Sequence, residues 1–528
     1  MQAVGADQRH LDPSASDARP DRQGIDERRY TTVLIFGVAL VFAWVLWTSY
    51  WDSGLYGDNI EQFVWSHSME WGYSKHPPLP TWLIGLATWL IGPHWWLANA
   101  VAALCFAVTG VLTWLIAQRL CGTRVANATI VLWGLQQCFS VSAEIYNHNT
   151  VLVMCLAATT YSVMRGLCSR FGSAWWLVSG AFAGLAMLAK YQAALPLAAL
   201  VGVVLLVGRS RVEHLARKLT LAFLVCVLLL VPHLYWSIVN QFPSLRYAST
   251  ALESGGVLRR LSWILTFIVN QIRMVFPQLL AIGLSIGLSI GLARWTRGAA
   301  KPQPVNPTPQ SESGSAEFDA REVKIWMWAL VWGPALLLVV MSLVTGSVLR
   351  NHWGVQVFQF LSMWIAWRWS MSPALRPKNL IISALLVHAM GLTYYAIKQS
   401  DPGNVLSERR ADSAYPAQRM SDAALAHWKS LTACPLRIVA GDFEAGLVSA
   451  FSREFPVVYT STLATPWVDS ADLVKHGVLY VLDQNAGAPP DATPVVRWPL
   501  ASGPAGLTKY VQFAVRLPGV ACPVPAKM

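Results

Sequence analysis

The chain contains many apolar runs that are long enough to cross a lipid bilayer. A helix needs about 20 predominantly apolar residues to span the hydrocarbon core. We place such runs at 31–50, 95–117, 125–143, 149–167, 174–190, 191–208, 218–239, 274–293, 325–345, 353–369 and 379–397. A composition of 54% hydrophobic and 13% charged residues also excludes an ordinary soluble globular protein. We therefore expect a polytopic α-helical membrane protein with about eleven transmembrane helices.

Two further apolar segments do not fit this pattern. The run 79–92 is short and begins after Pro77 and Pro78, so it predicts an interfacial or re-entrant helix rather than a span. The run 256–276 is interrupted by three arginines and stays ambiguous between a span and a surface segment.

Basic residues alternate between the loops that join these runs. Loops on one side carry many Lys and Arg residues, beginning with Arg28 and Arg29, and the opposite loops carry few. Basic loops stay on the cytoplasmic side, so an odd number of spans predicts a cytoplasmic N-terminus and an outer C-terminal part. The first run has no cleavage site of small residues after it and is expected to be a permanent span. The net charge of +12 forms no continuous stripe, which argues against binding to nucleic acid.

The polar segments predict the domain organisation. Residues 1–28 are expected to form a disordered cytoplasmic tail, and 29–399 the transmembrane domain. Within this domain, residues 296–322 predict a flexible cytoplasmic linker because they are rich in Pro and Ser. Residues 400–528 predict a small α/β domain, with strands in "LRIVAG", "FPVVYT" and "GVLYVLD" and a helix in "FEAGLVSAFSR". Cys434 and Cys522 lie in this domain and would pair in an oxidising compartment, a question that the sequence leaves open.

Titratable side chains gather in the loops expected on the outer side. The first such loop, 51–94, contains "YGDNIEQFVWSHSMEWGYSKHPPLP", in which Asp58 and Glu61 lie three residues apart. A helix would place both carboxylates on one face, where they can supply a general base, although a solvated acidic face is an equal alternative. Six basic residues of the outer loops can neutralise an anionic leaving group such as phosphate or, individually, anchor to headgroups: Lys75, His76, Lys190, Arg246, Arg350 and His352.

Three separated segments resemble one family. "GDNIEQFVWSHSMEWGYSKHPPLPTW", "GLAMLAKYQAAL" and "PHLYWSIVNQFPSLRY" are similar, in matching order, to signatures of bacterial membrane glycosyltransferases of the C superfamily. This group includes protein O-mannosyltransferases (glycosyltransferase family 39 type), aminoarabinose transferases of lipid A and rhizobial galacturonosyltransferases. The resemblance covers roughly residues 30–400 and implies a glycosyltransferase-C-type fold.

The resemblance also implies a reaction. A sugar would be transferred from a polyprenyl-phosphate-linked donor to a hydroxyl acceptor, which is lipid A, another glycolipid, a polysaccharide or a protein, at the periplasmic face of the bacterial inner membrane. Asp58 would be the general base with Glu61 as its companion. Many relatives have adjacent Asp-Glu where this chain has Asp-x-x-Glu, so either carboxylate remains a candidate. Lys75 and His76 would contact the donor phosphate, with Lys190, Arg350 and His352 as further candidates, and no metal or other cofactor is implied.

The chemistry of a sugar phosphate donor is consistent with glycosyl transfer. A sugar phosphate is already activated, so the protein has to orient the acceptor, remove its proton and stabilise the departing phosphate, with inversion at the anomeric carbon. The alternative function is a lipid or solute transporter, which would place ionisable groups inside the spans. A glycosidase would also use two carboxylates, and a non-catalytic scaffold would need none of these residues. The sugar, the acceptor and the oligomeric state stay open.

Overall fold

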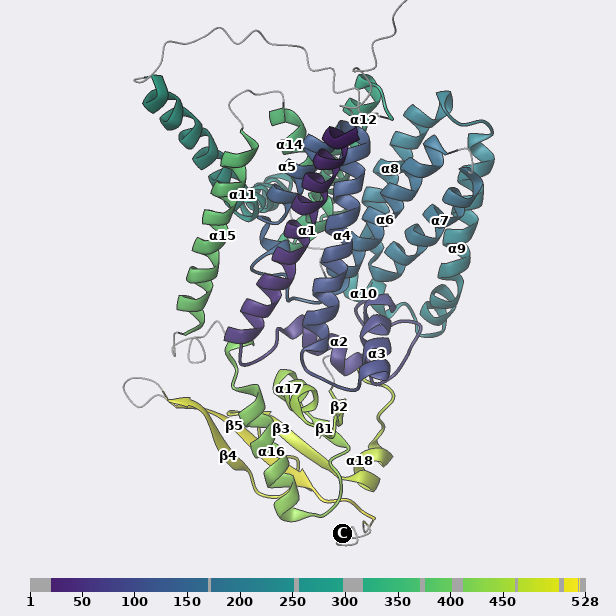
Figure 1. Cartoon of the computed structure of the whole chain (residues 1–528). Helices are drawn as coiled ribbons and strands as arrows, with labels where there is room; N and C mark the ends of the chain where they lie inside the picture. The colour runs from purple at the N-terminus through teal and green to yellow at the C-terminus, as the bar shows by residue number, and fades with distance from the viewer. Residues whose placement is uncertain are drawn as a thin grey trace, which may run out of the picture.

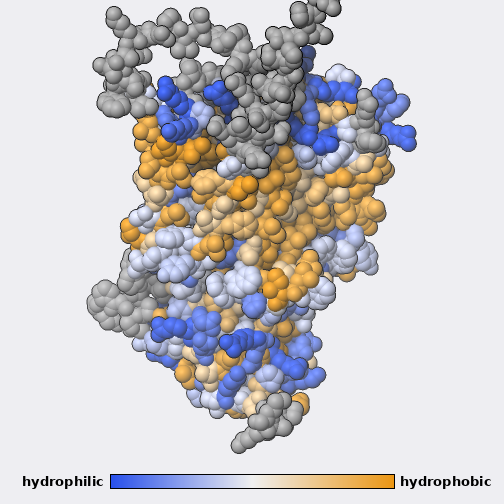
Figure 2. All heavy atoms as spheres, in the orientation of Figure 1, coloured by the Kyte–Doolittle hydropathy of each residue, from blue (hydrophilic) through white to orange (hydrophobic). Residues whose placement is uncertain are grey.

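The computed structural model describes residues 20–169, 172–250, 256–297, 317–370, 376–400, 412–460, 464–502, 508–520 and 522. It consists of a helical body with a small α/β domain at one end (Figure 1). On the face that Figure 2 shows, apolar residues form a belt across the helical body, and hydrophilic residues gather on the α/β domain and at the opposite end. Such a belt is what a polytopic membrane protein presents to lipid.

The first half of the helical body contains α1 (Pro20–Trp51), α2 (Gly57–Trp65), α3 (Leu79–Ile91), α4 (Leu97–Cys121), α5 (Thr123–Trp133), α6 (His148–Cys168), α7 (Gly172–Ala189) and α8 (Ala194–Val207). The second half contains α9 (Leu215–Val239), α10 (Pro243–Ser249), α11 (Val257–Arg297), α12 (Ala320–Thr345), α13 (Gly354–Val357), α14 (Leu361–Ser370) and α15 (Pro377–Gln399).

The helical membrane fold is confirmed, whereas the number of eleven spans is not. Eight helices of the described residues are long and apolar enough to cross a membrane. The predicted spans 125–143 and 353–369 are interrupted. The first contains α5, which has 11 residues, and the second is divided between α13, which has 4 residues, and α14, which has 10 residues.

Polar side chains accompany these interruptions. Buried Ser362 of α14 accepts hydrogen bonds from Gln136 (3.0 Å) and from Gln278 of α11 (2.7 Å). Non-helical backbone is tolerated in a membrane protein where it is buried against other protein segments.

The two ambiguous apolar segments differ in outcome. The short run predicted at 79–92 forms α3, a helix of 13 residues that lies beside α2 at the end of the helical body nearest the α/β domain (Figure 1). The run 256–276 forms the first part of α11, a single helix of 41 residues.

The predicted polar tail and linker lie largely outside the described residues. Of the tail, 1–19 is not described, and α1 begins at Pro20, a residue that suits the first helical position. Residues 298–316 of the linker and 401–411 after α15 are likewise outside the described ranges.

The α/β domain contains the predicted strands and helix. Its elements are α16 (Ala417–Leu431), β1 (Ile438–Ala440), α17 (Phe443–Phe451), β2 (Val457–Tyr459), α18 (Ser470–His476), β3 (Val478–Asp483), β4 (Val496–Ser502) and β5 (Thr508–Arg516). The strand order is β2-β1-β3-β5-β4. Strand β1 is parallel to β2 and β3, whereas β5 is antiparallel to β3 and β4.

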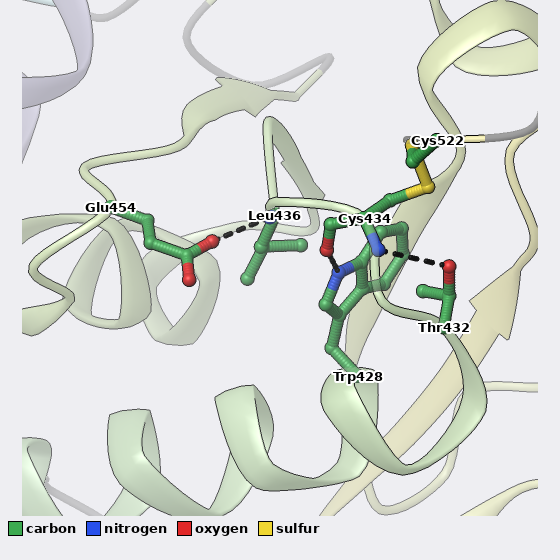
Figure 3. The surroundings of a disulfide bond; sticks show 6 residues. All are labelled: Trp428, Thr432, Cys434, Leu436, Glu454 and Cys522. Atoms are coloured by element: carbon green, nitrogen blue, oxygen red, sulfur yellow. Dashed lines mark hydrogen bonds between the residues drawn. A yellow bond between two sulfur atoms is a disulfide. The ribbon is translucent and has the colours of Figure 1, made fainter. Parts of the chain in front are cut away.

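A disulfide closes the α/β domain (Figure 3). It joins Cys434, just before β1, to Cys522, after β5, with 5.3 Å between the two Cα atoms. The carbonyl of Cys434 also accepts a hydrogen bond from the buried indole of Trp428 (2.7 Å). The pairing that the sequence left open is therefore present, and it ties the end of the chain to the start of the sheet.

Helix α17 of the α/β domain packs directly on α2. A Cβ atom added at Gly446 would lie 2.2 Å from Cγ2 of Ile60, so the two helices are in close contact there. The backbone N–H groups of Ser53 and Gly54 donate to the carbonyl of Ser413, at 2.9 and 2.8 Å. The α/β domain therefore supports the helix that holds the two predicted acids.

Candidate active site

Helix α2 places its two acids in different environments. Asp58 lies in the first turn and is exposed, whereas Glu61 lies one turn later and is 8% exposed. The N–H of Gly57, at the start of the helix, donates to Asp412 Oδ2 of the α/β domain (3.1 Å). A carboxylate in the first turn of a helix interacts favourably with the helix dipole.

Asn147 holds Asp58 from the side of α6. Its Nδ2 donates to Asp58 Oδ2 (2.7 Å), while its Oδ1 caps α6 by accepting from the N–H groups of Asn149 and Thr150. Asn59 fixes this arrangement because its amide donates to the carbonyl of Glu144 (3.0 Å) and accepts from a neighbouring backbone N–H (2.9 Å). The loop before α6 and helix α2 are therefore locked together.

Glu61 forms an ion pair with Lys75, with 2.6 Å between Oε2 and Nζ. Burial raises the pKa of Glu61 to about 7, although Lys75 opposes this shift. Burial lowers the pKa of Lys75, but the Glu61 carboxylate more than compensates and the net direction is upward. Lys75 also lies 5.8 Å from the centre of the Tyr247 ring.

Lys190 is the most deeply buried of the predicted cations. It is 6% exposed and its Nζ donates to Asn149 Oδ1 (2.7 Å). Burial lowers the pKa of Lys190 to about 7, and the charge of Asp58 acts in the opposite direction. The electrostatic interaction places Lys190 and Asp58 at the same site although 132 residues separate them in the sequence.

Three histidines from distant segments meet beside these residues. The ring centroids of His76 and His148 are 3.8 Å apart, and those of His148 and His352 are 6.3 Å apart. Burial lowers the pKa of His76 well below its usual value, and nearby Lys190 adds to the effect. Burial also lowers the pKa of His352 to about 4. Neutral imidazoles can donate a hydrogen bond to an anion without adding a full charge.

The two predicted arginines lie at the edge. Arg350 is exposed and its charge contributes to the lowered pKa of His352. Arg246 is also exposed, and its guanidinium contacts the carbonyl of Asn240 at 3.5 Å, within the same turn of chain. The structure therefore brings together Asp58, Glu61, Lys75, His76, Lys190 and His352, with Arg350 beside them. In the described part of the chain, no hydrogen bond or ion pair joins Arg246 to these residues.

The three motifs are also joined through the loop at 71–76. Tyr191 Oη lies 2.6 Å from Nε2 of His233, whose Nδ1 lies 2.6 Å from the carbonyl of Trp71. Ser244 donates to the carbonyl of Tyr73 (2.9 Å). Side chains of the second and third motifs thus hold the backbone of the first.

A second acid pair, half-buried Asp52 and buried Glu144, was not among the predicted site residues, although Glu144 lies in a titratable segment of an outer loop. The hydroxyl of Tyr395 donates to Asp52 Oδ1 (2.6 Å) and lies 3.2 Å from Glu144 Oε1. Burial raises the pKa of Asp52 to about 6 and that of Glu144 well above its usual value. Gln399 and Ser413 complete this network at the junction with the α/β domain.

Asn147 and His148 were also missed as site residues. The only sequence signal was their position in the polar "YNHN" segment directly before an apolar run. The capping of α6 by Asn147 accounts for one polar residue there, but the ring contact of His148 with His76 depends on tertiary structure.

Comparisons with known proteins show which chains this one resembles. Residues 75–236 match the family described as dolichyl-phosphate-mannose-protein mannosyltransferase. The crystal structure of ArnT from Cupriavidus metallidurans bound to undecaprenyl phosphate is similar with a TM-score of 0.59 and 15% identity, over 93% of this chain and 99% of that chain. The same protein in the apo state has a TM-score of 0.52 and 17% identity, over 93% and 99% of the two chains. No curated protein sequence matches the chain. The chain therefore has the glycosyltransferase C fold seen in ArnT, and the predicted resemblance to this superfamily of membrane glycosyltransferases is confirmed.

Proposed function

We propose that the protein transfers a sugar from a polyprenyl-phosphate-linked donor to a hydroxyl acceptor. The observation that carries this proposal is the convergence of Asp58, Lys190 and the histidines at the end of an apolar helical body. The similarity to a structure that holds undecaprenyl phosphate supports the same class of donor.

Asp58 is the proposed general base. It is exposed, and Asn147 orients one of its carboxylate oxygens. Glu61 is less suited to this role because it is buried and paired with Lys75. The acceptor hydroxyl would give its proton to Asp58 while its oxygen attacks the anomeric carbon. The bond from that carbon to the phosphate oxygen breaks on the opposite face, so the configuration inverts and polyprenyl phosphate leaves.

Lys190 is the proposed principal contact of the donor phosphate. A buried amine with a pKa near 7 is readily protonated when an anion arrives, because the anion stabilises its charged form. His76 and His352 can donate hydrogen bonds to the same phosphate, and Arg350 adds positive charge at the edge. Lys75 is held by Glu61 and contributes its charge from a fixed position. A place for Arg246 in this set remains a prediction.

The proposed location is the bacterial inner membrane, with the site and the α/β domain on the periplasmic side and the N-terminus in the cytoplasm. The disulfide in the α/β domain supports an oxidising compartment for that side. Basic residues such as Arg119 and Arg211 lie in loops assigned to the opposite side. A transporter would place its ionisable groups within the spans, whereas most of the site residues lie at their ends.

Comparative mass spectrometry of envelope lipids and glycans tests this function. Cells with the intact gene are compared with a deletion, with Asp58→Asn and with Asp422→Asn, a change to an exposed carboxylate of α16 that serves as the control. We expect the deletion and Asp58→Asn to remove the mass of one sugar from the same species, and Asp422→Asn to leave it in place. Unchanged glycans in all strains, with loss of a transported solute, would support the transporter instead.

A further inference from the structure

A cavity of about 380 Å³ lies next to the proposed site, between the helical body and the α/β domain. Its walls come from the loop after α2, from the end of α9 and the start of α10, and from the segment before α18 (Figure 1). The residues that matter for its chemistry are Glu70, Tyr73, Ser74, Trp236, Asn240 and Trp467. This volume lies in the range of sites for small organic ligands.

The aromatic residues form two walls of the cavity. Trp236 and Trp467 come from different domains and are both partly exposed. Trp236 packs on Gly72, where an added Cβ would lie 2.4 Å from the indole ring. Tyr73 meets Trp467 edge-on, with 6.3 Å between ring centroids. Rigid aromatic faces beside hydroxyl, amide and carboxylate groups suit a ligand that is apolar on its ring faces and polar at its edge, as a sugar is.

The charge of the cavity differs from that of the proposed phosphate site. Of the described residues that line it, Glu70 is the only charged one. Its Oε1 accepts a hydrogen bond from Ser68 (2.7 Å). The basic residues Lys75 and His76 follow Ser74 directly in the chain but are not among the described residues that line the cavity. Arg246 contacts the carbonyl of the lining residue Asn240 but is not itself part of the described lining. A phosphate or a uronate in the cavity would therefore face the Glu70 carboxylate directly, which a neutral or amino sugar tolerates better.

The backbone around the cavity is held in an uncommon conformation. Five non-glycine residues in the described ranges have positive φ, and three of them, Gln241 (60°), Phe242 (55°) and Ala464 (48°), line or adjoin the cavity. Such conformations cost free energy and concentrate at ligand sites, where they preorganise the loops.

The cavity is coupled to the proposed active site through the backbone. Ser74 immediately precedes Lys75, and the N–H of Tyr73 donates to the carbonyl of His76 (3.1 Å). We propose that the cavity binds a neutral or amino-substituted sugar ring of the acceptor, so that the hydroxyl acceptor is carried by a saccharide. This inference rests on the proposed glycosyl transfer and specifies its acceptor class.

Binding to the purified full-length protein tests the site directly. Saturation-transfer NMR is used to titrate the methyl glycosides of glucose, glucosamine and glucuronic acid, with inorganic phosphate as a competitor. We expect the first two to bind, the glucuronide to bind more weakly and phosphate not to compete. Trp467→Ala should weaken binding about tenfold, which equals about 1.4 kcal/mol. Trp498→Ala, on strand β4 and outside the cavity lining, should leave binding unchanged.

Equal binding to wild type and Trp467→Ala, or preferred binding of the glucuronide, would overturn the inference. Glu70→Gln provides a second variant of almost unchanged shape, for which we expect a several-fold loss of preference for the amino sugar. If Trp467→Ala alters the unfolding temperature, its loss of binding is not interpreted, and Glu70→Gln alone tests the inference.

Cellular product analysis separates this inference from the proposed function. If Asp58→Asn abolishes sugar transfer while Trp467→Ala and Glu70→Gln leave the amount of product unchanged, the acceptor inference fails and the function stands. If no variant alters any glycan but glycoside binding still depends on Trp467, the cavity stands and the proposed function fails. Loss of product from the lipid fraction or from the polysaccharide fraction identifies which molecule carries the sugar.

Discussion

The contact between α17 and α2 predicts that a methyl group far from the chemistry will slow the reaction. Gly446→Ala places a Cβ 2.2 Å from Cγ2 of Ile60, a side chain that is 2% exposed. Ordinary contacts between carbon atoms need about 3.5–4.0 Å, so the two helices have to separate by more than about 1 Å. Asp58 precedes Ile60 by two residues and would move with α2.

Two opposing contributions decide whether Gly446→Ala stabilises or destabilises the protein. Overpacking costs about 1–3 kcal/mol, whereas replacing a helical glycine by alanine gains about 1 kcal/mol in propensity. We therefore expect a net destabilisation of up to about 2 kcal/mol. A shift of about 1 Å in a catalytic group can lower the rate about a hundredfold. The rate of sugar transfer should therefore fall strongly although most of the protein stays folded.

The assay combines thermal unfolding of the purified protein with the amount of glycan product in cells. Gly202→Ala in α8 is the matched control, because no heavy atom lies within 4 Å of the position that its Cβ would take. Gly202→Ala should raise the unfolding temperature slightly, because alanine favours helix more than glycine, and should leave the amount of glycan product unchanged. Normal product formation by Gly446→Ala would refute the idea that the α/β domain positions α2.

Three further predictions concern the site and the disulfide. Asp58→Asn should lower the rate constant for transfer by about 10²–10⁴-fold, and Glu61→Gln by less, as measured in single turnovers; the reverse order would make Glu61 the base. Burial lowers the pKa of Lys190 to about 7, so its positive charge is lost as pH rises through 7, and kcat/KM for the donor should fall above pH 7 by up to about tenfold per pH unit. Lys190→Arg should flatten this pH profile. If the variant has the same profile as the wild type, Lys190 is not the phosphate contact. Replacing Cys434 and Cys522, 88 residues apart, by serine should destabilise the α/β domain by about 4.6 kcal/mol on the chain-entropy model. Limited proteolysis that finds the domain equally resistant would contradict this.

The sequence alone determined the class of fold and most of the chemical groups in the candidate site. The apolar runs predict membrane helices because a bilayer requires a minimum apolar length, which is a local property of the chain. The strands of the α/β domain were predicted for a similar reason, since short runs of β-branched residues between turns favour strands locally. The polar loop segment at 56–80 revealed Asp58 and Glu61 because charged residues are conspicuous beside apolar runs.

Only the tertiary structure decided which of these groups meet. It gave the two acids different partners, since Glu61 pairs with Lys75 and Asp58 accepts a hydrogen bond from Asn147. It brought the ring centroid of His148 within 3.8 Å of that of His76. It also left Arg246 without a described contact to the other site residues and replaced two expected spans by the shorter helices α5 and α14. Hydropathy specifies that a segment is buried but not its neighbours, and these contacts join residues far apart in the chain. They are set by the packing of helices against one another and against the α/β domain, to which no short stretch of sequence corresponds.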